Sequence, residues 1–206
     1  MNARALISRC RLWLGALACA GIGISCSKPG DGHLDALNNA HLAVQAGMST
    51  LESWHADSIQ TARERVDERF KDLNWLVADS TLTFQMKDGR IIGDWNRVKR
   101  FLKDGPERLE TLKAEGQKGL SQLENLANAI RNKATHDSEG TPMDEAYFAD
   151  ASKRELDWVG QWQAAVAETE RLVGSGLALE ASTRTSLDSL IRAKRAEWAQ
   201  QIAGDE

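Results

Sequence analysis

The sequence predicts an all-α fold, an elongated antiparallel bundle of three to four long helices. Only three prolines interrupt the 206 residues, and Leu, Ala, Glu, Lys, Arg and Gln, which favour helices, are abundant. Apolar residues recur at steps of three or four along most of the chain, which is typical of helices with one buried face. Because such helices are not stable alone, we expect them to pack side by side in a single domain over residues 33–206.

The first helix is expected to begin after Gly32 and to run towards Ala78. Its face opposite the apolar stripe is dense with charge over residues 63–72, which we interpret as a face turned to solvent rather than a binding patch. One position of the stripe is occupied by His55 instead of an apolar residue. The stripe itself consists of Val44, Met48, Leu51, Ile59, Ala62, Val66, Phe70, Leu73 and Leu76.

Residues 79–93 interrupt the helical pattern, and two interpretations stay open for them. Asp88-Gly89 lies between apolar residues, which is typical of a hairpin turn, but the flanking alternation is short. We expect either an ordered loop or a small β-hairpin packed against the bundle. Long ordered loops often carry function, so Phe84 and Ile91 are candidate contacts for a partner or ligand.

Three further helical segments follow. The pattern predicts a short helix over 94–103 and a longer one over 106–134. Gly116 and Gly119 in the longer helix either permit a close helix contact or are merely tolerated. A last apolar stripe starts near residue 141, and Gly174-Ser175-Gly176 either ends that helix or kinks it before a final one.

The N-terminus has a different character from the rest of the chain. Three arginines precede an uncharged run over 12–25, and Cys26 follows the small residue Ser25. A basic start, a short apolar middle and small residues before a cut are the features of a secretory signal. The run is too short to cross a bilayer core of about 30 Å. We therefore predict a removable signal peptide over residues 1–25.

A cysteine at the expected cut makes residues 1–30 resemble a bacterial lipoprotein signal. The resemblance implies that Cys26 becomes the new N-terminus and carries acyl chains such as palmitate, with residues 26–32 as a flexible tether. Ser27, in place of Asp, implies delivery to the outer membrane, on its periplasmic or its surface side. Gly23 departs from the pattern, which usually has a branched aliphatic residue there. The alternative is ordinary cleavage to a soluble periplasmic protein.

The composition after residue 25 excludes several kinds of chemistry. All three cysteines lie within residues 1–26, so a disulfide scaffold, a thiol nucleophile and a cysteine-ligated metal are excluded beyond them. Three of the 26 basic residues precede residue 26, which leaves 23 against 30 acidic residues and argues against binding nucleic acid by bulk charge. The four histidines are scattered, and no catalytic, phosphate-binding or calcium-binding motif is present. We expect no enzyme activity, no metal and no cofactor.

Six of the seven tryptophans lie after residue 26, and they admit two interpretations. Tryptophan fills wide gaps in a thin bundle, and it is also enriched at binding surfaces. Trp158 and Trp162 are four residues apart and so share one helix face. Together with Trp95 they are the candidate lining of an aromatic groove.

These observations lead to two expectations of function. The first is a non-enzymatic, lipid-anchored protein of the cell envelope that acts as a helical interaction or structural module. Its partners would be the membrane, through the lipid, and either another envelope protein or further copies of itself in a coiled-coil assembly. The alternative is an envelope binding module that holds a small apolar, peptide or glycan ligand in a groove lined by tryptophan.

Overall fold

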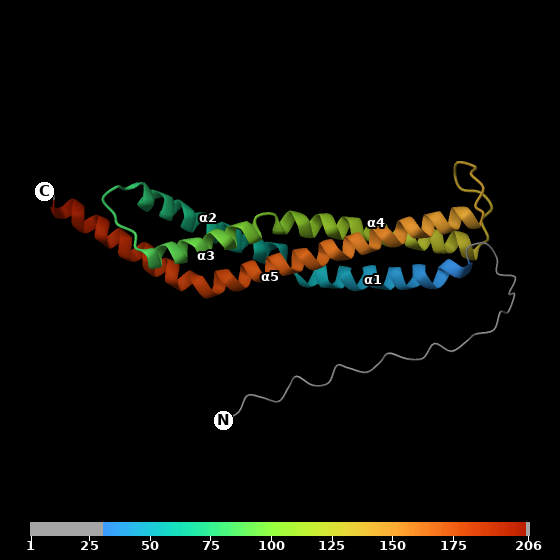
Figure 1. Cartoon of the computed structure of the whole chain (residues 1–206), viewed down its shortest axis with the longest axis horizontal. Coiled ribbons are helices and arrows are strands. Elements are labelled where there is room, and N and C mark those ends of the chain that lie inside the picture. The colour runs from blue at the N-terminus through green and yellow to red at the C-terminus, as the bar shows by residue number, and fades with distance from the viewer. Residues whose placement is uncertain (1–30, 205–206) are drawn as a thin grey trace, which may run out of the picture.

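The computed structural model describes residues 31–204 and confirms the all-α prediction, since no strand is present within that range. A single 3₁₀ turn, η1, precedes five α-helices, which Figure 1 shows as one long rod. The elements are η1 (Asp31–His33), α1 (Leu34–Ser53), α2 (Ala56–Ala78), α3 (Met86–Leu102), α4 (Gly105–Arg131) and α5 (Glu145–Gly204).

The five helices form three antiparallel columns (Figure 1). The first column is α1 followed by α2, the second is α3 followed by α4 running back, and α5 alone is the third. At about 1.5 Å per residue, the 60 residues of α5 extend for about 90 Å. η1 lies at one end of the rod, and α5 ends at the other (Figure 1).

The core is a continuous apolar seam along all three columns. It contains most of the stripe predicted for the first column, from Val44 through Leu76, and the matching faces of α3, α4 and α5. Burying one such side chain contributes about 1.5–3 kcal/mol relative to leaving it exposed. The seam explains why helices that are individually marginal are stable together.

The first column is two helices, so the prediction of one helix from Gly32 to Ala78 is wrong at one point. α1 ends at Ser53, and Trp54 and His55 adopt extended backbone before α2 begins. The last turns of α1 are rich in hydroxyls that bond to its own carbonyls, including Ser53 Oγ to Thr50 O at 2.6 Å. Such bonds compete with the helical ladder. His55, which interrupts the apolar stripe, stands at this break.

A hairpin does not form over residues 79–93, and the ordered loop is confirmed only for 79–85. α3 begins at Met86, eight residues before the predicted start. The Asp88 carboxylate accepts a hydrogen bond from the Gln85 backbone N–H at 2.8 Å, which completes a capping box. Asp88-Gly89, which the sequence presents as a turn, is therefore part of the first turn of a helix.

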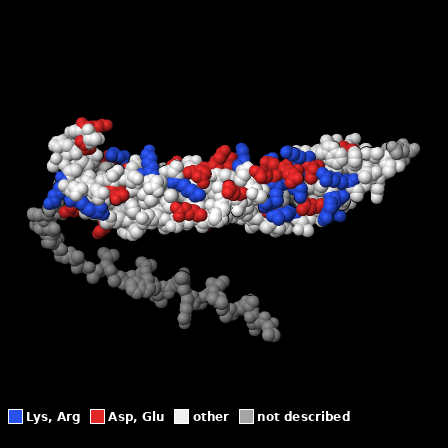
Figure 2. All heavy atoms as spheres, turned by 180° about the vertical axis from the view of Figure 1, so that it is seen from behind, with Lys and Arg blue, Asp and Glu red and all other residues white. Residues whose placement is uncertain are grey.

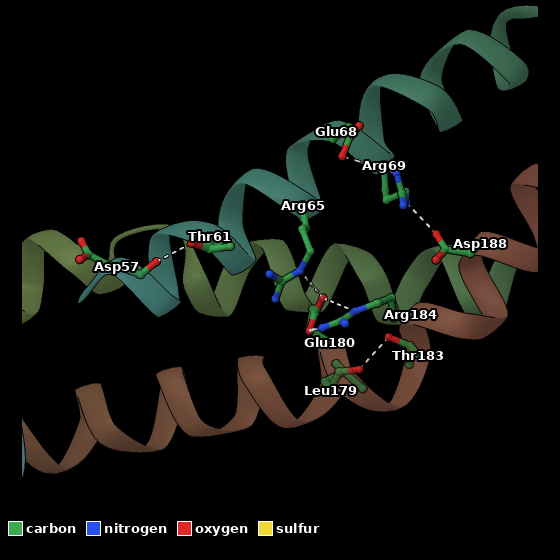
Figure 3. Close-up of polar contacts among 10 residues, drawn as sticks. All are labelled: Asp57, Thr61, Arg65, Glu68, Arg69, Leu179, Glu180, Thr183, Arg184 and Asp188. Carbon is green, nitrogen blue, oxygen red and sulfur yellow. Dashed lines mark hydrogen bonds and ion pairs between the residues drawn. The ribbon is translucent and has the colours of Figure 1, made fainter. Parts of the chain in front are cut away.

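Gly174 and Gly176 do not end the last helix, because α5 is continuous from Glu145 to Gly204. A Cβ at Gly176 would lie 2.6 Å from Leu102 Cδ2, so this glycine lets the end of α3 approach α5 closely. The change in direction comes later. Figure 3 shows α5 turning beyond Leu179, whose carbonyl accepts a hydrogen bond from Thr183 Oγ1 at 2.7 Å. Hydroxyls bonded to a carbonyl four residues back commonly bend helices.

The connection between α4 and α5 is a compact loop. Asp137 accepts hydrogen bonds from the backbone N–H groups of Glu139 and Thr141, and Gly140 has a φ of +83°. α5 starts at Glu145 rather than near 141, because Asp144 caps it through the Tyr147 N–H at 2.9 Å.

Candidate functional site

All five predicted contact residues lie in or against the core, and three of them belong to α3 and the loop before it. Trp95 is completely buried in α3, so its ring is not accessible in this structure. Ile91 and Phe84 are half-buried and pack against the same core. The Lys194 ammonium lies 5.2 Å from the centre of the Phe84 ring and donates to the Thr83 carbonyl. Phe84 thus helps to hold the 79–85 loop against α5.

Trp158 and Trp162 form a stacked pair on α5. Their ring centres are 6.1 Å apart and the ring planes differ by 27°. Trp162 is 2% exposed, and its indole N–H donates to the Leu112 carbonyl of α4 at 3.0 Å. Trp158 is half-buried, and its indole N–H has no hydrogen-bond partner among residues 31–204. The pair therefore has one fixed ring and one ring at the surface.

Three glycines make room for these rings. A Cβ at Gly47 in α1 would lie 2.5 Å from Trp162 Cζ3, and one at Gly116 in α4 would lie 2.8 Å from Trp162 Cζ2. A Cβ at Gly119 would lie only 1.8 Å from Trp158 Cη2. Gly116 and Gly119 of α4 therefore permit a close helix contact and are not merely tolerated. The sequence did not indicate the role of Gly47, because Trp162, whose ring it accommodates, is more than 100 residues away along the chain.

The exposed side of the pair opens into a groove between α4 and α5, which we call the Trp groove. It is an open depression of about 560 Å³, within the range of small-molecule sites. Among residues 31–204, its aromatic lining consists of Trp158 and Trp162. The complete lining is Glu115, Lys118 and Gln122 from α4, with Trp158, Gln161, Trp162 and Ala165 from α5.

A second surface feature lies at the end of the rod where α5 finishes, and we call it the far tip. Trp75 lies edge to face against Trp198, with ring centres 4.9 Å apart. Figure 2 shows few charges at this end, next to a densely charged band. Four of the five large hydrophobic side chains that are strongly exposed in residues 31–204 come from the elements that meet there: Trp75 (49%), Val77 (56%), Met86 (96%) and Ile202 (47%).

An ion-pair cluster joins α2 to α5 (Figure 3). Glu180 has a side chain only 3% exposed and bonds to Arg65 at 3.2 Å and to Arg184 at 2.6 Å. Burial raises the pKa of Glu180, but the hydrogen bonds from Arg184 and Arg65 outweigh burial and hold the pKa below its usual value. Arg69 and Asp188 form a second bridge at 2.7 Å. Sequence reading missed the cluster, because Arg65 and Glu180, like Arg69 and Asp188, are more than 100 residues apart.

Within residues 31–204, no three His, Cys, Asp or Glu side chains are grouped so that they could hold a metal ion. None of the described helices is both long and apolar enough to cross a membrane. Cys26, the predicted lipidation site, lies outside the described residues, as do the predicted signal peptide and most of the tether.

Comparison of the chain with protein-family models, with curated proteins and with solved structures finds no match.

Proposed function

We propose that this protein is a non-enzymatic, lipid-anchored interaction module of the cell envelope. The observation that carries the proposal is the position of the far tip. Among residues 31–204, four of the five large hydrophobic side chains that are strongly exposed come from elements that meet at one end of the rod, while η1, which follows the proposed anchor at Cys26, lies at the other end (Figure 1). Exposed apolar patches mark interaction sites on proteins.

The long helix α5 connects the end that follows the proposed anchor to the far tip. α5 spans the whole length without interruption, so it couples the two ends through about 90 Å of helix. The far tip uses α2, α3 and α5 together, and the 79–85 loop is tied to α5 there. Thr81 Oγ1 bonds to Gln201 Oε1 at 2.7 Å, and Gln201 Nε2 donates to the Thr81 carbonyl at 3.2 Å. A partner at the far tip would meet a fixed surface.

The partner in this proposal is another envelope protein or a second copy of the chain. The apolar tip favours a protein surface, since aromatic residues and methionine are enriched at protein interfaces. The acidic overall composition, with a formal net charge of −4, does not favour nucleic acid.

Photo-crosslinking in intact cells tests the tip. A photoreactive residue replaces Met86, which is 96% exposed at the tip, and in a matched variant it replaces Leu42, which is 62% exposed on α1. We expect a discrete adduct from position 86 but not from position 42, and its loss when Trp75→Ser is added. Equal labelling from both positions, or an uncoupled monomer throughout, would contradict a docking tip.

Fractionation tests the anchor separately. The Cys26→Ala variant should move from the membrane fraction to the soluble fraction, because two or more acyl chains hold a protein firmly and their loss releases it. Unchanged membrane association of Cys26→Ala would refute lipidation at this residue while leaving the tip proposal open to its own test.

A further inference from the structure

We propose that the Trp groove binds a neutral oligosaccharide. This inference narrows the alternative of a groove-based binding module and does not depend on the lipid anchor or on the far tip. It depends on the shape of the groove, on the charges of its lining and on the way its aromatic floor is held.

The floor of the groove is rigid before any ligand arrives. Trp162 is fixed by its hydrogen bond to the Leu112 carbonyl, and Gly47 and Gly116 enclose its ring. Trp158 stacks on Trp162 and covers Gly119. A preformed site on helices spends little binding free energy on ordering its own side chains.

The polar lining favours a neutral ligand. Glu115 and Lys118 have opposite charges, so an anion or a cation would be attracted by one and repelled by the other. Gln122 and Gln161 each offer a donor and an acceptor. The half-buried Trp158 adds an indole N–H that no described residue accepts. The lining therefore offers both donors and acceptors beside the aromatic rings, and its formal charges cancel.

A saccharide matches this lining better than an apolar helix or peptide does. Each sugar hydroxyl donates and accepts, as the two glutamines require, and the C–H face of a pyranose ring is an apolar surface that can lie on an indole. An apolar helix in the groove would cover four polar side chains without pairing them. Each unpaired group would cost about 1–3 kcal/mol.

Spectroscopy of the full chain tests the proposal. The protein, in a detergent without a sugar head group, is titrated with cellotriose, maltotriose and triacetylchitotriose, and the indole N–H signals are followed by NMR. We expect at least one neutral trisaccharide to shift the Trp158 signal and leave the Trp75 signal at the far tip unchanged. Trigalacturonate, which is anionic, should bind more weakly than the neutral sugars.

A matched pair of glutamines provides the control. Gln161 and Gln163 are both exposed on α5, but only Gln161 lines the groove. Gln161→Ala should weaken binding about fivefold through one lost hydrogen bond, and Gln163→Ala should leave it unchanged. Both substitutions replace exposed side chains, so folding is preserved in each.

Four results would overturn the proposal. They are no shift at Trp158 with any of the three neutral sugars at millimolar concentration, a shift confined to Trp75, equal weakening by the two alanine variants, and binding of an apolar helical or proline-rich peptide where the sugars fail.

Discussion

The two halves of the rod achieve the same three-column packing by different means. In the near half, formed by α1, α4 and α5 up to Gly174, tryptophan rings fit against glycines on neighbouring helices. In the far half, formed by α2, α3 and α5 from Gly176, charged side chains bridge the columns. All three buried charged residues of the described chain, Asp88, Glu180 and Lys194, lie in this half.

The difference shows how each half gains its specificity. Where a ring packs against a glycine, the space available fixes the arrangement, because a single methyl group added to the glycine would overlap the ring. A buried carboxylate between two arginines is defined by charge and hydrogen bonds, and removing one partner leaves the other unpaired. The near half should therefore depend mainly on the fit of its rings, while the far half should in addition draw stability from the ionised carboxylate of Glu180.

The largest effect is expected from Trp162→Ala. It removes a ring that is 2% exposed at the centre of the near half, and substitutions of this kind cost about 3–5 kcal/mol. Trp75→Ala, at the far tip where half of the side chain is exposed, should cost about 1 kcal/mol or less. Free energies of unfolding from urea titration compare the two. Equal losses would show that the near half does not depend on its enclosed ring.

Gly47→Ala should cost about 2 kcal/mol. The added Cβ would lie 2.5 Å from the fixed Trp162 ring, an overlap that costs about 3 kcal/mol, and the better helix propensity of alanine returns about 1 kcal/mol. Gly160→Ala on α5 is the matched control, since nothing lies within 4 Å of its added Cβ. It should stabilise by about 0.5–1 kcal/mol. Stabilisation by both substitutions in urea titration would contradict the interlocked packing.

Glu180→Gln tests the far half through pH. The pKa of Glu180 is lower in the folded protein than in the unfolded chain, so its ionised form stabilises the fold. Above about pH 5 the wild type should be more stable than the variant by about 1–2 kcal/mol. The advantage should shrink as the pH falls through the depressed pKa. An advantage that stays constant from pH 7 to about pH 3, measured by thermal unfolding, would show that charge is not the cause.

The smallest effects come from two ion pairs with the same spacing on α5. Arg184 bonds to the buried Glu180, and Arg184→Ala should cost about 1 kcal/mol. Arg154 pairs with Asp150, and both side chains are 65% exposed, so Arg154→Ala should cost under about 0.5 kcal/mol. Added salt should reduce the small effect further. Indistinguishable losses in urea titration would remove the distinction between buried and exposed pairs.

The sequence predicted the helical faces well, and the helix ends less well. The stripe from Val44 to Leu76 is buried almost as expected, because periodicity reports which side of a helix is apolar. The break between α1 and α2 at Trp54 and His55 interrupts the apolar stripe at one position only, so the sequence gives little sign of it. The start of α3 at Met86 depends on a capping box whose Asp88-Gly89 pair resembles a hairpin turn in the sequence. Local patterns of this kind are ambiguous until neighbouring helices are in place.

The candidate site was predicted only in part. Trp158 and Trp162 do meet at a groove, since a spacing of four residues puts them on one face. Trp95 has the same residue type but belongs to the core, and the exposed Val77 and Met86 of the far tip were not singled out. Whether an aromatic side chain is buried depends on what packs over it, and the sequence around the residue does not contain that information.

By itself, the sequence of this protein determined an all-α, elongated, antiparallel bundle, because helix propensity and apolar period are properties of short segments. Tertiary structure decided where the helices break, which glycines pack against a tryptophan ring and which carboxylates are buried. Those features depend on partners such as Gly47 and Trp162, or Arg65 and Glu180, that are about 115 residues apart along the chain. Only the packed bundle brings them together, and their shapes and charges then select one arrangement.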